Sequence, residues 1–221
     1  MQLGRVSIDW LGHSGILIRD SKIIYIDPYS IKENSEKADF IFITHNHYDH
    51  CSIEDMQKIV KQGTKIILSP DCQSKVTRFS VPVQIEVFQP GQEKTFGTIK
   101  VASLPAYNIG KKFHPKEESW LGYLIKLDDV LIYHAGDTDL IPEMKNLTGY
   151  GQSKKDFVAL LPIGGRFTMD AEEAAEAAKI IKPSLAIPIH YGSIVGTQDD
   201  AKEFLELCTE KGIRAEILNK I

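Results

Sequence analysis

The sequence has few cysteines, no long apolar run and no dense basic stretch. Its three cysteines, Cys51, Cys72 and Cys208, match no metal-binding spacing, so we expect reduced thiols of a cytoplasmic protein. No window approaches the roughly 18 consecutive apolar residues of a membrane helix. Residues 1–5 also lack the apolar core and cleavage site of a signal peptide. These absences indicate a soluble protein without a membrane span.

The lack of a basic stretch also argues against a nucleic-acid partner. The formal net charge is −4, and the nearest basic run, Lys111-Lys112, is too short to follow a phosphate backbone. A composition of 43% apolar and 25% charged residues is that of an ordinary globular protein. We therefore expect one domain over residues 1–221 with a small-molecule substrate. The sequence is also compatible with a homo-oligomer.

Short apolar runs that end at turn residues predict strands in both halves of the chain. Residues 40–44 are apolar and β-branched, which is typical of a strand buried on both faces. Asp128-Asp129 predicts a hairpin turn between two of the strands. The other predicted strands cover residues 6–11, 15–18, 22–26, 65–68, 83–88, 99–104, 122–127, 130–134, 157–161, 185–189 and 214–218.

Three helices are predicted from capping residues and apolar spacing. Ser52 caps a helix that stops at Gly63, and Asp170 caps a helix over residues 171–181. A last helix begins at Thr197 and runs through Glu210. Because each half ends with strands alternating with helices, we expect an α/β sandwich of two packed sheets with helices outside them.

Four potential metal ligands follow the predicted strand at residues 40–44: His45, His47, Asp49 and His50. Neutral imidazole and carboxylate are good ligands for zinc and related metals. In a turning segment, His45 and His47 can point one way and Asp49 and His50 another, so one loop can serve two neighbouring ions. The alternative, an exposed polar loop, is less favoured because the run holds three of the chain's seven histidines.

Two further polar residues follow predicted buried strands. Asp137 comes after the strand at residues 130–134, and His190 comes directly after the strand at residues 185–189. Functional sites of α/β folds lie at such strand ends. Alone, each residue could simply form a turn, but together with the histidine cluster they are candidate metal ligands.

Six segments resemble the metallo-β-lactamase superfamily, in the branch of small hydrolases that includes the UPF0173 type and the lactonase-like proteins. They occur in the family's order, at residues 10–14, 26–28, 45–50, 134–138, 161–165 and 188–192. The resemblance implies a four-layer αββα sandwich with the site at one edge of the two sheets. It also implies the metal ligands: His45 and His47 for one ion, Asp49, His50 and His190 for a second, and Asp137 bridging both.

The resemblance gives two more residues a place near the site and leaves one ligand position open. Asp27 matches an early family aspartate that orients ligands, and we expect His13 to be a hydrogen-bonded structural residue. Where the family has a further histidine for the first metal, this chain has Asn108, and His114 lies six residues later. An amide oxygen is a poor replacement for imidazole on a zinc-like ion, so we favour His114.

These residues predict a hydrolase that uses two divalent ions, zinc in first place and manganese or iron as alternatives. Water between two such ions, about 3.5–4 Å apart, becomes hydroxide near neutral pH and can attack a carbonyl or phosphoryl centre. Asp49 can orient this nucleophile or pass a proton to the leaving group. The predicted substrate is a small ester, lactone, amide or phosphodiester. The alternatives are an RNA-processing nuclease, a di-iron oxygen- or nitric-oxide-reducing protein and a non-catalytic metal-stabilised sensor.

Overall fold

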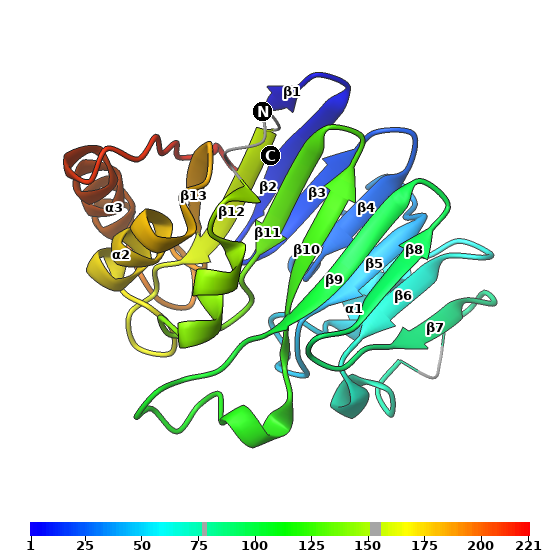
Figure 1. The fold of residues 1–221 in the computed structure, drawn as a ribbon. Coiled ribbons are helices and arrows are strands. Elements are labelled where there is room, and N and C mark those ends of the chain that lie inside the picture. Colours follow the sequence, from blue (N-terminus) through cyan, green and yellow to red (C-terminus); the bar gives the residue numbers. More distant parts are fainter. Residues whose placement is uncertain (77–78, 151–155) are drawn as a thin grey trace. The chain divides into compact units, whose positions relative to one another are not determined.

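The computed structural model describes residues 1–76, 79–150 and 156–221. They divide into two compact units, which we call the first unit (Met1–Gln89 with Asn219–Ile221) and the second unit (Pro90–Leu218). Each unit is built on one mixed sheet (Figure 1). No helix among the described residues is both long and apolar enough to cross a membrane.

The first unit contains a seven-stranded sheet. Its strands are β1 (Gln2–Leu3), β2 (Val6–Gly12), β3 (Gly15–Arg19), β4 (Ile23–Ile26), β5 (Phe40–Ile43), β6 (Lys65–Leu68) and β7 (Gln84–Val87). They lie in chain order across the sheet. Strands β1 to β4 pair antiparallel, and β4 to β7 pair parallel. A helix, α1 (Ile53–Ile59), and a 3₁₀ helix, η1 (Pro70–Cys72), complete this unit.

Helix α1 begins at the predicted cap and ends earlier than predicted. The Ser52 hydroxyl accepts a hydrogen bond from the backbone N–H of Asp55, which satisfies one open donor of the first turn. Met56 and Ile59 bury their side chains in the apolar core of the unit. The helix stops at Ile59, before Gly63, because Val60 adopts extended backbone and is itself buried in that core.

The second unit contains a six-stranded sheet. Its strands are β8 (Glu93–Phe96), β9 (Ile99–Pro105), β10 (Leu121–Leu127), β11 (Val130–His134), β12 (Asp156–Pro162) and β13 (Leu185–Ile189). They lie across the sheet in the order β13-β12-β11-β10-β9-β8. Strands β8 to β11 pair antiparallel, and β11 to β13 pair parallel. Two 3₁₀ helices, η2 (Lys116–Glu118) and η3 (Pro142–Leu147), precede β10 and β12.

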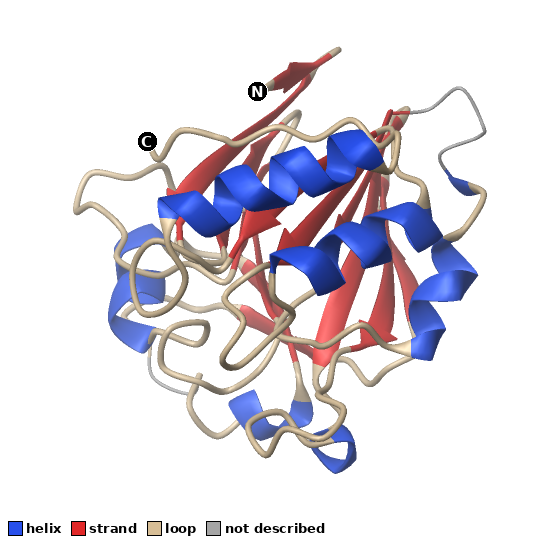
Figure 2. Ribbon diagram, turned by 90° about the vertical axis from the view of Figure 1, so that its left-hand side faces the viewer, coloured by secondary structure: helices blue, strands red, loops and turns tan. Residues whose placement is uncertain are grey.

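Two longer helices pack together in the second unit: α2 (Ala171–Ile181) and α3 (Gln198–Glu210) (Figure 2). Both begin with reciprocal capping bonds, formed by Asp170 with Glu173 and by Thr197 with Asp200. Most of the buried positions of α2 are alanines, which let its backbone approach α3 and β12 closely. The predicted bounds of α2 and the start of α3 are therefore confirmed.

One predicted strand is wrong, and two strands were not predicted. Residues 214–218 form only a single bridge between Ala215 and Ala186. Ala186 exchanges backbone hydrogen bonds with residues 214 and 216, but the next donor on β13 would be Pro188, which has no N–H. Strands β1 and β8 lack the apolar pattern that would predict a strand. Strand β1 has only two residues, and β8 is an edge strand with three exposed polar residues.

Candidate metal centre

In the first unit, parallel pairing brings Asp27 beside the histidine loop. Asp27 directly follows β4 and Thr44 directly follows β5, and these strands are parallel neighbours. The Asp27 N–H donates to the Phe42 carbonyl at 2.9 Å, which continues the ladder by one residue. Asp27 then takes a left-handed backbone conformation, φ 45°. Its buried carboxylate therefore lies against Thr44, at the start of the loop.

The Asp27 carboxylate fixes which ring nitrogen of two histidines carries a proton. It accepts hydrogen bonds from the Thr44 N–H (2.8 Å), the Thr44 hydroxyl (2.7 Å) and His50 Nδ1 (2.8 Å). Because the hydroxyl proton goes to Asp27, Thr44 Oγ1 accepts from His45 Nδ1 at 2.9 Å. With Nδ1 protonated in both neutral rings, the Nε2 atoms of His45 and His50 carry lone pairs that are free of that proton and could bind a metal.

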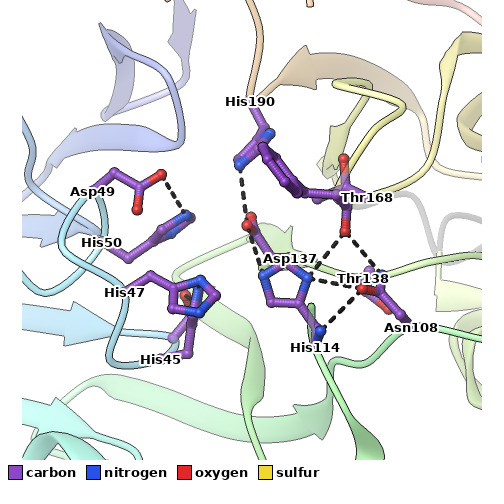
Figure 3. A network of polar contacts seen from close by, with 12 residues as sticks. His45, His47, Asp49, His50, Asn108, His114, Asp137, Thr138, Thr168 and His190 are labelled. Atoms are coloured by element: carbon purple, nitrogen blue, oxygen red, sulfur yellow. Dashed lines mark hydrogen bonds and ion pairs between the residues drawn. The ribbon is translucent and has the colours of Figure 1, made fainter. Parts of the chain in front are cut away.

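The candidate ligand atoms of this loop lie close together (Figure 3). His45 Nε2 is 3.0 Å from His47 Nδ1, and the Asp49 carboxylate is 3.7 Å from His50 Nε2 and 2.9 Å from His13 Nε2. Ligand atoms about 2.0–2.1 Å from a tetrahedral zinc are about 3.3 Å apart. The first unit therefore offers two pairs of candidate ligands with suitable spacing, and His13 contacts Asp49.

In the second unit, Asp137 and His190 lie at one edge of the sheet because β11, β12 and β13 run parallel. Asp137 follows β11 and His190 follows β13. The Asp137 carboxylate oxygen Oδ2 is 3.0 Å from His190 Nε2 and 3.2 Å from His114 Nε2 (Figure 3). Each of these two distances is near the separation of two ligand atoms on a tetrahedral ion, about 3.3 Å.

Two glycines allow the backbone to approach this edge closely. Gly136 has φ 68°, and a Cβ added there would lie 2.5 Å from the carbonyl oxygen of Leu121. A Cβ on Gly164 would lie 2.8 Å from His190 Nδ1. A side chain at either position would shift the segment that carries Asp137 or the ring of His190.

The structure separates the two candidates for the remaining ligand. Asn108 follows β9, which runs in the same direction as β11 because both pair antiparallel with β10. Its amide oxygen accepts hydrogen bonds from the backbone N–H and the ring of His114. It is the ring of His114 that faces the Asp137 carboxylate.

A cavity of about 600 Å³ lies beside the histidine loop in the first unit. Tyr29 and Tyr48, whose rings meet edge to face at 6.0 Å, line it together with Cys51 and Lys75. Burial, together with the nearby Tyr48 and Asp49, raises the pKa of Tyr29. The Tyr48 side chain is exposed, and Lys75 gives the cavity wall a positive charge.

The cysteines are buried free thiols, as the sequence predicts. A hydrogen bond from the Cys72 thiol lowers the pKa of Cys51. Burial raises the pKa of Cys208 to about 11.

Comparison with known proteins gives the family. The model of the β-lactamase superfamily domain matches residues 7–190. A UPF0173 metal-dependent hydrolase of Thermococcus kodakarensis is 34% identical over 215 residues, which cover 93% of each chain. This chain belongs to the β-lactamase superfamily, in the UPF0173 family of metal-dependent hydrolases.

Solved structures agree with this membership. A protein from Parabacteroides distasonis, described as a metal-dependent hydrolase, has a TM-score of 0.83 at 30% identity and covers 97% of this chain and 94% of its own. Igni18, a metallo hydrolase from Ignicoccus hospitalis, has a TM-score of 0.75 at 27% identity, with 97% and 95% covered. The predicted family and the metallo-β-lactamase fold class are therefore confirmed.

For this UPF0173 member, the predicted site residues fall into two sets. His13, Asp27, His45, His47, Asp49 and His50 gather in the first unit, and Asn108, His114, Asp137 and His190 gather in the second. Thr44 and Asp139 also contact these sets and were not predicted. Thr44 carried a usable signal, since it lies between a buried strand and the first histidine, whereas Asp139 is one of many acidic turn residues.

Proposed function

We propose that this chain hydrolyses a small ester, lactone, amide or phosphodiester with two bound divalent ions, zinc in first place. The proposed ligands are His45, His47, Asp49, His50, His114, Asp137 and His190. The family supports metal-dependent hydrolysis, and the donor set supports the choice of zinc, since imidazole and carboxylate suit this ion.

One observation carries the proposal: three buried histidines each direct one ring nitrogen to a fixed hydrogen-bond acceptor. His50 donates to Asp27, His45 donates to Thr44, and His114 contacts two oxygens. The other nitrogen of each ring lies 3.0 to 3.7 Å from another proposed ligand atom. Metal ligands typically show this arrangement, because the outer hydrogen bond sets the tautomer and orients the ring.

Bound divalent ions would supply a Lewis acid and a water that ionises near neutral pH. Asp49 would accept the proton of the attacking water and deliver it to the leaving group. His13 would hold the Asp49 carboxylate at 2.9 Å, while the Trp10 indole N–H fixes the His13 carbonyl at 2.8 Å. Asp27 and Thr44 would keep His45 and His50 oriented throughout turnover.

The cavity beside the loop supports a small-molecule substrate. Its volume of about 600 Å³ lies within the usual range for ligand pockets, roughly 300–1,000 Å³. The rings of Tyr29 and Tyr48 offer an apolar wall, and Lys75 offers a positive charge. Lys75 also donates a hydrogen bond to the carbonyl of Asn46, so the cavity wall is tied to the ligand loop.

The test combines metal analysis with a substrate panel. We expect purified protein to bind two equivalents of zinc and to hydrolyse at least one member of a panel of simple esters, lactones, amides and phosphodiesters. His47→Ala and Asp137→Ala should each abolish turnover and lower the zinc content. Normal turnover in either variant would contradict the proposed ligand set. Zinc binding without turnover would favour a sensor, and turnover only on RNA would favour a nuclease.

A further inference from the structure

The Asn108 side chain closes a loop on His114 in the second unit. The Asn108 N–H donates to the His114 carbonyl at 2.7 Å, and the His114 N–H donates to Asn108 Oδ1 at 3.1 Å. Within this loop Gly110 takes φ 78°, which permits the reversal of the chain. The six-residue separation between Asn108 and His114 is therefore bridged by the asparagine itself.

The orientation of the Asn108 amide follows from its neighbours. Its Nδ2 atom lies 3.0 Å from Asp139 Oδ1 and 3.0 Å from the Phe167 carbonyl, and both of these atoms only accept. Its Oδ1 atom faces the His114 backbone N–H, which only donates. The reversed amide would oppose all three partners, so Oδ1 must face His114.

This orientation fixes the tautomer of His114. The Nδ1 atom of His114 lies 3.0 Å from Asn108 Oδ1 and 3.0 Å from the Phe167 carbonyl. Both are acceptors, so Nδ1 carries a proton. In the neutral ring Nε2 then carries the lone pair, and it is this atom that lies 3.2 Å from Asp137 Oδ2.

Asp139 anchors the arrangement. This buried carboxylate accepts from Asn108 Nδ2, from the Ile109 N–H at 2.8 Å and from Lys111 Nζ at 2.7 Å. Lys111 also donates to the Thr168 carbonyl at 2.8 Å, so the positive charge that balances Asp139 is held in place. The carboxylate therefore orients the amide, and the amide orients the imidazole.

We propose that Asn108 is a positioning residue for the metal ligand His114 and that Asp139 sets the orientation of Asn108. The ligand role of His114 rests on the proposed function. The same logic operates in the first unit, where a carboxylate (Asp27) orients a hydroxyl (Thr44), which accepts from a histidine (His45). Asn108 thus stands where the family pattern has a histidine ligand, but in this proposal the ligand is His114 and Asn108 orients it.

The experiment is a double-substitution cycle with two readouts. Asn108→Asp places a carboxylate against Asp139, and Asp139→Asn removes the anchor. In the combined variant, the carboxylate at position 108 accepts from His114, and the amide at position 139 donates to that carboxylate. Zinc affinity is measured by competition with a chromophoric chelator, and the His114 tautomer is read from ring ¹⁵N shifts in the metal-free protein, with the signals assigned by His114→Gln. Asn146→Asp, at an exposed position in the same unit, is the matched control.

We expect Asn108→Asp to weaken zinc binding by roughly 10- to 100-fold, as is typical when a residue that orients a ligand is changed. The combined variant should bind zinc more tightly than Asn108→Asp but less tightly than wild type, because it restores the pairing between positions 108 and 139 and still lacks the bonds from Asn108 to the Phe167 carbonyl and from Lys111 to Asp139 Oδ1. The wild-type His114 signals should show the Nδ1-protonated ring, and Asn108→Asp should broaden or shift them.

Three outcomes would overturn the proposal. Tighter zinc binding in Asn108→Asp, with little loss in His114→Gln, would make position 108 the ligand. A lower melting temperature with unchanged zinc affinity and unchanged His114 signals would give Asn108 a structural role alone. An Nε2-protonated ring in the wild type would contradict the tautomer argument directly. If the wild type bound no zinc, the proposed function would fail, and the ¹⁵N shifts would still decide the positioning claim.

Discussion

Replacing Asp27 with asparagine tests the arrangement in the first unit most directly. The change keeps the shape of the side chain and exchanges one carboxylate oxygen for an NH₂ group. In the wild type, Asp27 Oδ2 accepts from both the Thr44 hydroxyl and His50 Nδ1, while Oδ1 accepts from the Thr44 N–H. Whichever way the new amide turns, its NH₂ group meets at least one donor. The more favourable response is for His50 to move its proton to Nε2 and to accept from that NH₂ group through Nδ1.

The magnitude follows from these contacts. A His50 ring protonated on Nε2 has lost its proposed ligand atom, and changes to residues that orient ligands typically cost 10- to 100-fold in metal affinity. That range corresponds to about 1.4–2.7 kcal/mol at about 1.36 kcal/mol per tenfold. Losing at least one charge-assisted hydrogen bond at the buried Asp27 should also lower the free energy of unfolding by about 1.5–3 kcal/mol.

Zinc affinity is the assay, measured by chelator competition on protein shown to be folded by circular dichroism. Asp20→Asn is the matched control, because this carboxylate is in the same unit and, among the described residues, accepts only from the neighbouring Ser21 hydroxyl. A zinc affinity within twofold of wild type in Asp27→Asn would refute the reasoning. It would mean that the tautomer of His50 does not matter for binding.

Three further predictions address other parts of the molecule. Gly164→Ala should weaken zinc binding at least tenfold while circular dichroism stays unchanged, because its Cβ would lie 2.8 Å from His190 Nδ1; unchanged affinity would show that the ring can move freely. Asp55 lies in the first turn of α1 and is not a proposed ligand. Burial acts to raise its pKa, but hydrogen bonds from Ser52, two backbone N–H groups and Lys58 outweigh it and hold the pKa below its ordinary value of 3.8. A depressed folded-state pKa contributes stability above the unfolded-state value, and this is lost as the pH falls through the folded one. Asp55→Asn should therefore cost about 1–3 kcal/mol in urea unfolding at pH 7, and the difference should shrink as the pH falls below the ordinary pKa of 3.8; a constant difference would contradict this. Finally, a saturating excess of zinc should raise the melting temperature of metal-free protein, since binding to the folded state stabilises it, and no shift would argue against a folded-state metal site.

The strands that the sequence predicts correctly are those whose burial leaves an apolar pattern. Strand β5 is buried throughout, and its run of four apolar residues needs no context to be recognised. The edge strand β8 has no such pattern, because three of its four side chains are exposed. The pairing of residues 214–218 with β13 is limited by a proline in the partner strand, which a local pattern cannot reveal. Local patterns therefore predict buried elements and miss those that depend on a neighbour.

The candidate site also has one part that local sequence predicts and one part that depends on distant residues. His45, His47, Asp49 and His50 are adjacent in the sequence, so their chemistry can be read directly. Whether Asn108 or His114 faces Asp137 depends on contacts with Asp139 and the Phe167 carbonyl, which lie 31 and 59 positions after Asn108. No spacing rule relates such distant positions. The preference for His114 could rest only on ligand chemistry, and the structure adds the hydrogen bonds that hold it in place.

Strained backbone conformations occur at three of the residues whose side chains make these contacts. His13, Asp27 and His190 have φ values of 52°, 45° and 59°, a region where glycine would be unstrained. Holding another residue there costs of order 1–3 kcal/mol. Lys182 and Asp128 show that ordinary helix ends and turns also use this conformation, so strain alone identifies nothing. At the three site positions, however, the side chain contacts another proposed site residue, and glycine would remove that contact. The strain is retained where the fold needs both a sharp turn at the end of a strand and a polar side chain on it.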